Sequence, residues 1–264
     1  MLRYYVELMK RQFQQAMTYR ANWIFGILSG TFAVAIQVFI WRALYSGKEA
    51  VAGATLSDMV TYVLIVQVME TVLNANFMHG VGGAIRRGTI ATELIRPVRY
   101  KRAAFAEQMG KSSAAFVFEL IPRFIVCMLL FGIKPPASGL HFLAFVVFLA
   151  GSMVLNYHIL FLFGCTCFWL LSSMYFNAIN GMLISVFSGR VVPLWFFPPF
   201  LQTIAKYLPF RFLFYIPSSV YLGKLSPAEF LPYFLVQWAW IIGIILLERL
   251  VWARGIRKVV IQGG

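Results

Sequence analysis

Uncharged apolar stretches divide this chain into segments that are long enough to cross a membrane. A membrane-spanning α-helix needs about 20 consecutive, mostly apolar residues. No charged residue occurs from Ala21 to Trp41, and similar runs recur along the rest of the sequence. The pattern predicts six membrane spans, at residues 21–45, 59–80, 110–133, 141–171, 174–190 and 229–252. We therefore predict an all-α integral membrane protein that forms one transmembrane domain, residues 1–264.

The longest uncharged run covers residues 135–189 and has room for two of these spans. We place the break between them near Ser172 and Met174. The segment that follows, residues 191–224, cannot form one continuous helix because several prolines interrupt it. We expect an outer re-entrant segment of short helices, whose irregular backbone is buried in protein or faces water.

An amphipathic helix is predicted ahead of the first span, over residues 1–20. Leu2, Met9 and Phe13 fall on one apolar stripe, and basic and amide side chains fall on the other face. A helix of this kind lies along the inner leaflet, with its apolar stripe at the lipid boundary. The alternative is a soluble cap helix that packs on a partner.

A short and densely basic segment, residues 82–102, separates the second and third spans. Gly88 breaks the helix that arrives from upstream, Thr89 can cap a new helix, and Pro97 stops it. The new helix has about two turns, far too few to cross a bilayer. It has the form of a docking element for another protein on the cytoplasmic side. The alternative reading of its arginines is that they only hold the loop on that side.

Composition and charge place the chain in a membrane rather than on nucleic acid. The sequence is 61% hydrophobic and 12% charged, whereas charged residues make up about a quarter of an ordinary soluble domain. The net charge of +14 comes from basic residues that punctuate apolar runs. The N-terminal segment, the basic segment and the C-terminal tail hold fifteen Lys and Arg residues, against six on the opposite side. The positive-inside rule then predicts a multi-pass protein of the cell membrane with both termini cytoplasmic.

Candidate catalytic chemistry is sparse. The sequence has no nucleotide-binding P-loop, no Ser-His-Asp signature and no paired catalytic carboxylates, and its three histidines lie in different segments. Cys127, Cys165 and Cys167 fall inside apolar runs, where we expect small buried side chains rather than metal ligands. We therefore expect no enzyme activity, metal or cofactor in this chain.

Ionisable residues inside the expected spans are the default candidates for function. Glu119 and Arg123 are one helical turn apart, on a helix that Pro122 can kink, so they can pair with each other. Glu70 falls at a similar depth and can meet Arg123 across a helix interface, and Asn74 lies one turn on from Glu70. The alternative is structural: a charge-neutral pair that sets helix packing, and a hydrogen-bonded or protonated Glu70.

The order of these elements, together with two motifs, resembles a known family. A G-x-I-x-x-x-L-x-R-P motif lies between spans two and three, formed by Gly88, Ile90, Leu94, Arg96 and Pro97. A proline-rich stretch, VVPLWFFPPF…LPFRFLFYIP, precedes the last span. Over nearly its whole length the chain resembles the permease subunit of ABC-2 type exporters, and more narrowly their "uncharacterised transport system permease" branch.

The resemblance implies a half-transporter, for which we expect outward transport by alternating access. The aromatic, apolar outer segment and the few interior charges suit an amphiphilic substrate. Two such permeases, identical or paralogous, would pair with two separate ATP-binding subunits that hold ATP and Mg. The N-terminal amphipathic helix would be a second contact with the ATPase. The residues implied in ATPase coupling are Arg86, Arg87, Gly88, Thr89, Ile90, Glu93, Leu94, Arg96 and Pro97. The residues implied in an outer gate are Pro193, Trp195, Phe197, Pro198, Pro209 and Pro217.

Two other classes of function remain open from the sequence. An ion-coupled carrier would use Glu70, Glu119 and Arg123 as its relay and would need no ATPase. A non-transport membrane scaffold or lipid-modifying enzyme would need only the basic segment, as a docking patch.

Overall fold

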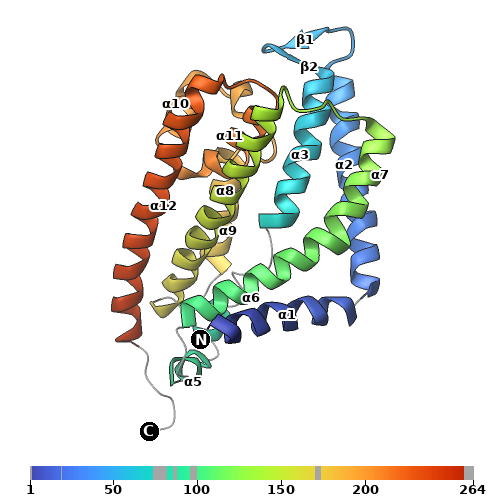
Figure 1. The fold of residues 1–264 in the computed structure, drawn as a ribbon. Coiled ribbons are helices and arrows are strands. Elements are labelled where there is room, and N and C mark those ends of the chain that lie inside the picture. The colour runs from blue at the N-terminus through green and yellow to red at the C-terminus, as the bar shows by residue number, and fades with distance from the viewer. Residues whose placement is uncertain are drawn as a thin grey trace.

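The computed structural model is a bundle of helices, and the expected all-α membrane class is confirmed (Figure 1). It describes residues 2–18, 20–73, 82–85, 88–95, 100–169 and 174–258. Within those residues, five helices are long and apolar enough to cross a bilayer. They cover Ala21–Leu44, Leu56–Leu73, Tyr100–Phe131, Gly139–Phe168 and Pro227–Ile256.

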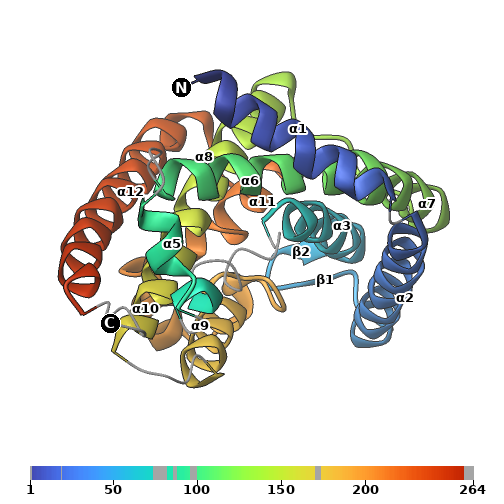
Figure 2. The ribbon, with the colours of Figure 1, turned by 90° about the horizontal axis from the view of Figure 1, so that it is seen from below.

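The N-terminal helix α1 (Leu2–Thr18) lies across one end of the molecule, and α2 (Arg20–Leu44) rises from it (Figure 1). Helix α1 packs along α6 (Tyr100–Ala115) (Figure 2). The two backbones approach closely at Gly110, where any Cβ would meet the backbone of Met9. The expected N-terminal helix is therefore present, and it lies flat against the first part of the third spanning helix.

A β-hairpin that the sequence did not suggest caps the opposite end of the molecule. Strands β1 (Ala50–Val51) and β2 (Ala54–Thr55) pair antiparallel across a two-residue turn. Both turn residues have positive φ, 50° at Ala52 and 72° at Gly53, as a type I′ turn requires.

Helix α3 (Leu56–Leu73) is the central element of the bundle. Its start is fixed by Thr55 and Asp58, since each residue's side chain accepts a hydrogen bond from the other's backbone N–H. In the most apolar stretch of α3, 61% of the residues are buried inside the protein, compared with 11% in the corresponding stretch of α2. The expected second span begins slightly earlier than predicted, and its last part, residues 74–80, lies outside the described residues.

The third spanning helix begins at Tyr100, ten residues before the expected start at residue 110. It consists of α6, a π-helical turn η1 (Phe116–Leu120) and α7 (Ile121–Phe131), with a change of direction between α6 and α7 (Figure 1). Pro122 stands at the start of α7, where it lacks an N–H and would crowd the preceding turn of a regular helix. The wider π turn accommodates it, and the kink expected at Pro122 is therefore spread over the turn before it.

Helices α8 (Gly139–Cys165) and α12 (Pro227–Ile256) pack against each other along their length. Gly151 allows a close approach, because a Cβ there would overlap the side-chain amide of Gln237. Gln237 donates to the backbone carbonyl of Phe148 at 3.1 Å and so hydrogen-bonds α12 to α8. A 3-10 turn, η2 (Thr166–Phe168), extends α8.

The fifth expected span, residues 174–190, corresponds to the 14-residue helix α9 (Met174–Phe187). At 1.5 Å per residue the described part of α9 extends about 21 Å, less than the roughly 30 Å hydrocarbon core. The expected break near Ser172 lies outside the described residues. Five spanning helices are found among the described residues, and a sixth span, expected at α9, stays a prediction.

The expected outer segment, residues 191–224, is a chain of short helices, and most of its prolines stand at their starts. Its elements are η3 (Leu194–Phe196), α10 (Pro199–Lys206), η4 (Pro209–Phe212) and α11 (Tyr215–Tyr221). Pro193 precedes η3, Pro198 precedes α10 and Pro209 opens η4. Proline suits these places because the first N–H groups of a helix have no intrahelical partner.

The main core lies where α3, α8, α12 and the outer segment meet. Phe212, Phe148 and Leu155 are among its fully buried side chains. The hairpin, α10 and α11 lie at one end of the bundle, and α1 and the end of α12 at the other (Figure 1). The short helix α5 (Ile90–Ile95) also lies at this second end.

Candidate functional site

Helix α5 stands where the sequence predicted a short helix between spans. Gly88 adopts φ +71°, a conformation that favours glycine, and its N–H donates to the carbonyl of Ile85 at 3.1 Å. The Thr89 hydroxyl donates to the carbonyl of Ala84 at 3.3 Å. The start of α5 is thus fastened to the turn before it, and its end at Ile95 comes two residues before Pro97.

The two isoleucines at the ends of α5 have opposite environments. Ile90 is buried, with 1% of its surface exposed, whereas Ile95 is 79% exposed. Ile90 therefore anchors the helix, and Ile95 presents an apolar side chain at the end of the molecule. Of the other coupling candidates, Arg86, Arg87, Arg96 and Pro97 and the side chains of Glu93 and Leu94 lie outside the described residues.

A polar network crosses the bundle at the depth of the intramembrane candidates. Glu119 Oε1 accepts a hydrogen bond from Arg123 Nη1 at 3.1 Å, which is the pairing expected for residues one turn apart. Arg123 Nη2 also donates to the backbone carbonyl of Gln67 in α3 at 3.4 Å. The pair therefore joins the third spanning helix to the central helix.

Glu70 continues this network to a partner that the sequence analysis did not assign. Its carboxylate accepts from Gln67 Nε2 and from Arg190 Nη1, each at 3.2 Å. Arg190 follows α9 and also donates to the Ser185 hydroxyl at 2.8 Å. The structure thus has two separate ion pairs, Glu119–Arg123 and Glu70–Arg190, in place of the expected contact between Glu70 and Arg123. Gln67 of α3 hydrogen-bonds to one residue of each pair. Asn74 lies outside the described residues.

Two glycines of α2 make room for the first of these ion pairs. A Cβ at Gly26 would meet the carboxyl group of Glu119, and a Cβ at Gly30 would overlap the guanidinium of Arg123. The glycines give α2 a groove in which both charged side chains lie. Only 9% of the Arg123 side chain and 22% of the Glu119 side chain remain exposed.

One of the outer-gate candidates, Trp195, lies in an aromatic cluster over the ends of α2 and α3. The ring centroid of Trp195 lies 5.3 Å from that of Tyr62 and 5.7 Å from that of Tyr215. The adjacent Phe196 stacks on Trp41 of α2 at 5.4 Å. Phe197 accepts a hydrogen bond at its carbonyl from Gln202 and links η3 to α10.

The turn after α9 is fixed to the central helix at Gly189. The Tyr62 hydroxyl donates to the Gly189 carbonyl at 2.6 Å, and the Tyr215 N–H donates to the Ser188 carbonyl at 2.9 Å. Gly189 has φ +78°, and a Cβ there would meet both tyrosines. The outer segment is therefore joined to α3 close to the Glu70–Arg190 pair.

Comparison with known families decides between the classes that the sequence left open. A family model described as "ABC-2 family transporter protein" matches residues 31–263. This chain belongs to the ABC-2 transporter family. It is the membrane permease of an ABC transporter, and permeases of this family work with ATP-binding subunits and are generally non-catalytic. No curated protein sequence matches the chain.

The permease contains a second buried charge cluster that the sequence analysis missed. Glu248 of α12 has only 3% of its side chain exposed, and it accepts from Lys101 Nζ at 2.8 Å. Its other oxygen lies 2.5 Å from His158 Nδ1 of α8. Glu248 falls inside the expected last span, residues 229–252, where an ionisable residue is a default candidate for function. His158 falls at a comparable depth of the expected span 141–171, so the sequence could have suggested that His158 and Glu248 meet.

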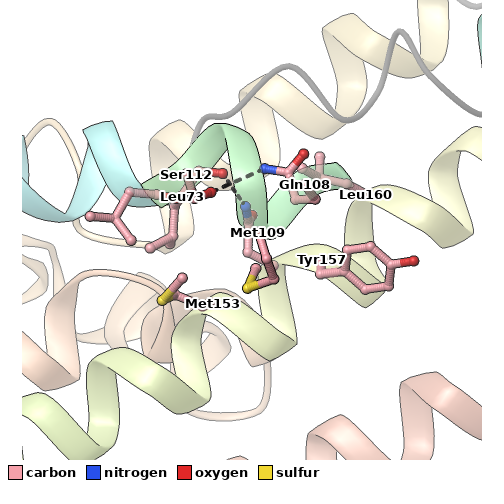
Figure 3. Close-up of a pocket in the computed structure, with 9 residues that line it drawn as sticks. Leu73, Gln108, Met109, Ser112, Met153, Tyr157 and Leu160 are labelled. Atoms are coloured by element: carbon pink, nitrogen blue, oxygen red, sulfur yellow. Dashed lines mark hydrogen bonds between the residues drawn. The ribbon is translucent and has the colours of Figure 1, made fainter. Parts of the chain in front are cut away.

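The end of α3 in the permease is held by side chains from its neighbours (Figure 3). Ser112 donates to the carbonyl of Val72 at 3.2 Å, and Asn156 donates to the carbonyl of Leu73 at 2.9 Å. Gln108 donates to the Ser112 hydroxyl at 3.4 Å. These bonds join the last described turn of α3 to α6 and α8. The same residues line a small pocket of about 10 Å³, close to the space of one water molecule.

Proposed function

We propose that this permease exports an amphiphilic substrate by alternating access, powered by two separate ATP-binding subunits. A second permease, identical or paralogous, completes the pathway. Both termini and α5 are cytoplasmic in the cell membrane, and the ATP-binding subunits hold ATP and Mg, so the permease itself needs no cofactor. The family implies the ATP-binding subunits; the direction, substrate and stoichiometry are our proposal.

The observation that carries this proposal is the geometry of α5. The helix is too short to span a membrane, is fastened by Gly88 and Thr89, and presents Ile95 at the end of the molecule that also carries α1. A buried apolar anchor at the centre of a contact is the usual source of binding energy between proteins. Ile95 is thus suited to enter a groove of the ATP-binding subunit.

The bundle offers a route from α5 to the outer segment. Motion of α5 would be transmitted along α6 and the π turn to the start of α7, where Arg123, paired with Glu119, bonds to α3. Glu70 and Arg190 would then carry the displacement to the turn after α9. From Arg123 onward, each step is a hydrogen bond between two helices or between a helix and the turn after α9, and such contacts between packed elements can transmit a switch.

The test is to replace Ile95 with Asp in the complete transporter, reconstituted with its ATP-binding subunits. We expect normal membrane insertion but at least tenfold weaker coupling of ATP hydrolysis to transport, because a carboxylate cannot enter an apolar groove without large desolvation cost. Ile95→Leu, which keeps the apolar side chain, should retain coupling. Charge reversal at Arg86 and Arg87, or Gly88→Pro, should uncouple in the same way.

Wild-type coupling in Ile95→Asp would show that α5 is not the transmission element. The carrier hypothesis predicts a different result, namely that Glu70→Gln abolishes transport and that transport needs no ATP. In the structure Glu70 and Glu119 each have an arginine partner, which supports a structural network rather than an ion relay.

A further inference from the structure

A large pocket lies at the α5 end of the permease, away from the polar network and the aromatic cluster. It has a volume of about 970 Å³ and lies between α1, α6, α8 and α12. These helices are neighbours in Figure 2. Small-molecule sites usually have volumes of about 300–1,000 Å³. The apolar lining is formed by Met9, Phe105, Met109, Val154 and Ile245.

The buried charges beside the pocket are already balanced within the protein. Lys101 pairs with Glu248, and its Nζ lies 5.1 Å from the ring centroid of Phe161 and 5.3 Å from that of Trp252. Glu248 is also bound by His158. Neither Lys101 nor Glu248 therefore leaves much uncompensated charge for a ligand.

Two other basic residues of the pocket, Arg102 of α6 and Arg249 of α12, are exposed and are not paired with an acidic residue within the described part of the chain. Guanidinium groups bind phosphate through paired N–H donors. The pocket thus combines an apolar lining with two arginines that suit an anionic phosphate group.

The surface beside Arg249 indicates where such a ligand comes from. Leu246, Leu247 and Leu250 of the same helix are exposed, as expected for a face covered by acyl chains. Tyr100 and Trp252, which also line the pocket, stack with their ring centroids 5.6 Å apart, and such aromatic residues are enriched at membrane–water interfaces. Basic pockets between transmembrane helices on the cytoplasmic side are characteristic sites for anionic lipid headgroups.

We propose that this pocket binds an anionic phospholipid of the adjacent leaflet, with its phosphate at Arg102 and Arg249 and an acyl chain along the apolar lining. The lipid is a resident ligand and not the exported substrate, so the inference stands apart from the proposed transport. It would bridge α1 and α6 to α8 and α12, two pairs of helices that flank the pocket.

The test is native mass spectrometry of the full-length permease purified from vesicles of phosphatidylcholine and phosphatidylglycerol. The wild-type protein should retain phosphatidylglycerol in preference to phosphatidylcholine. R102Q/R249Q should lower that preference about 25-fold, since each arginine near an anionic surface contributes about fivefold. R254Q/R257Q removes the same charge near the end of α12 but outside the pocket lining, and it should keep the preference.

A second variant separates the pocket from general surface charge. Val154→Trp fills the apolar lining and keeps both arginines, so it should also lose the retained phosphatidylglycerol while remaining monodisperse in detergent. The proposal is overturned if R102Q/R249Q retains as much phosphatidylglycerol as the wild-type protein, or if R254Q/R257Q loses as much. Displacement of the lipid by inorganic phosphate would also overturn it, because the site would then be one for a free anion.

Discussion

Arg123 is the residue on which the polar network of the permease most depends. It joins Glu119 to the Gln67 carbonyl and occupies the space that Gly30 leaves in α2. A buried ion pair is costly to break, because the remaining charge loses its partner where water cannot replace it.

We therefore expect Arg123→Met to lower the stability of the permease by about 3 kcal/mol, since it leaves Glu119 without its cation. The corresponding fall in Tm is about 10 °C in a thermal unfolding scan in detergent. The double variant Glu119→Leu/Arg123→Met removes both charges and should recover most of the loss. If the double variant is as unstable as the two single variants combined, the two residues do not act as a pair.

Individual residues also show what the sequence could and could not reveal about the site. The Glu119–Arg123 pair was predictable, because residues four apart on a helix lie on the same face. The partners of Glu70 and Glu248 were not, since Arg190 and His158 are distant in sequence and are brought close only by helix packing. Spacing along one helix is local information, and contacts between helices are not.

At the scale of elements, α1 packs directly on α6 and is therefore part of the folded bundle, not a helix that contacts only lipid. Their close approach at Gly110 has a simple consequence. Gly110→Val should force α1 away from α6 and cost about 1–3 kcal/mol, because a Cβ would meet the backbone of Met9. A lower Tm and faster proteolysis within α1 are the expected measurements.

The matched control is Gly181→Val in α9, where an added Cβ meets nothing within 4 Å. It introduces the same side chain into a helix without a close neighbour and should change stability little. Equal loss in the two variants would show that the loss at Gly110 does not come from the close packing of α1 on α6, since helix propensity alone favours valine over glycine.

The elements were predictable to different degrees. The start of helix α5 was predicted closely because Gly88 acts through local backbone sterics. The expected stop at Pro97 lies outside the described residues. The hairpin at residues 50–55 was not predicted, since its strands have two residues each and only Ala52 and Gly53 set its turn. The early start of the third spanning helix was missed because hydropathy marks the lipid-covered part of a helix and not the polar part that α1 covers.

At the scale of the whole molecule, the arrangement of the ends predicts the topology. Helices α1 and α5 and the end of α12 lie together, and the β-hairpin lies opposite (Figure 1). We expect a cysteine at Lys258 to react with a membrane-impermeant maleimide only after the cells are opened. A cysteine at Lys48, beside the hairpin, should react from outside.

Background labelling should be low, because Cys127, Cys165 and Cys167 are free but buried. Labelling of the Lys48 position only from the cytoplasmic side would reverse the orientation and remove α5 from reach of an ATPase.

The central claim is that an ATP-binding subunit docks on α5, and co-purification from the native membrane tests it most directly. Wild-type permease and Ile95→Asp would be solubilised in mild detergent, captured at equal amounts and analysed by mass spectrometry for associated proteins. We expect the wild-type permease and Ile95→Leu to retain an ATP-binding subunit, and Ile95→Asp to retain at most about a tenth as much, because a carboxylate is costly to bury in an apolar groove. Equal recovery with Ile95→Asp, or a wild-type permease purified without any ATP-binding subunit, would contradict the claim.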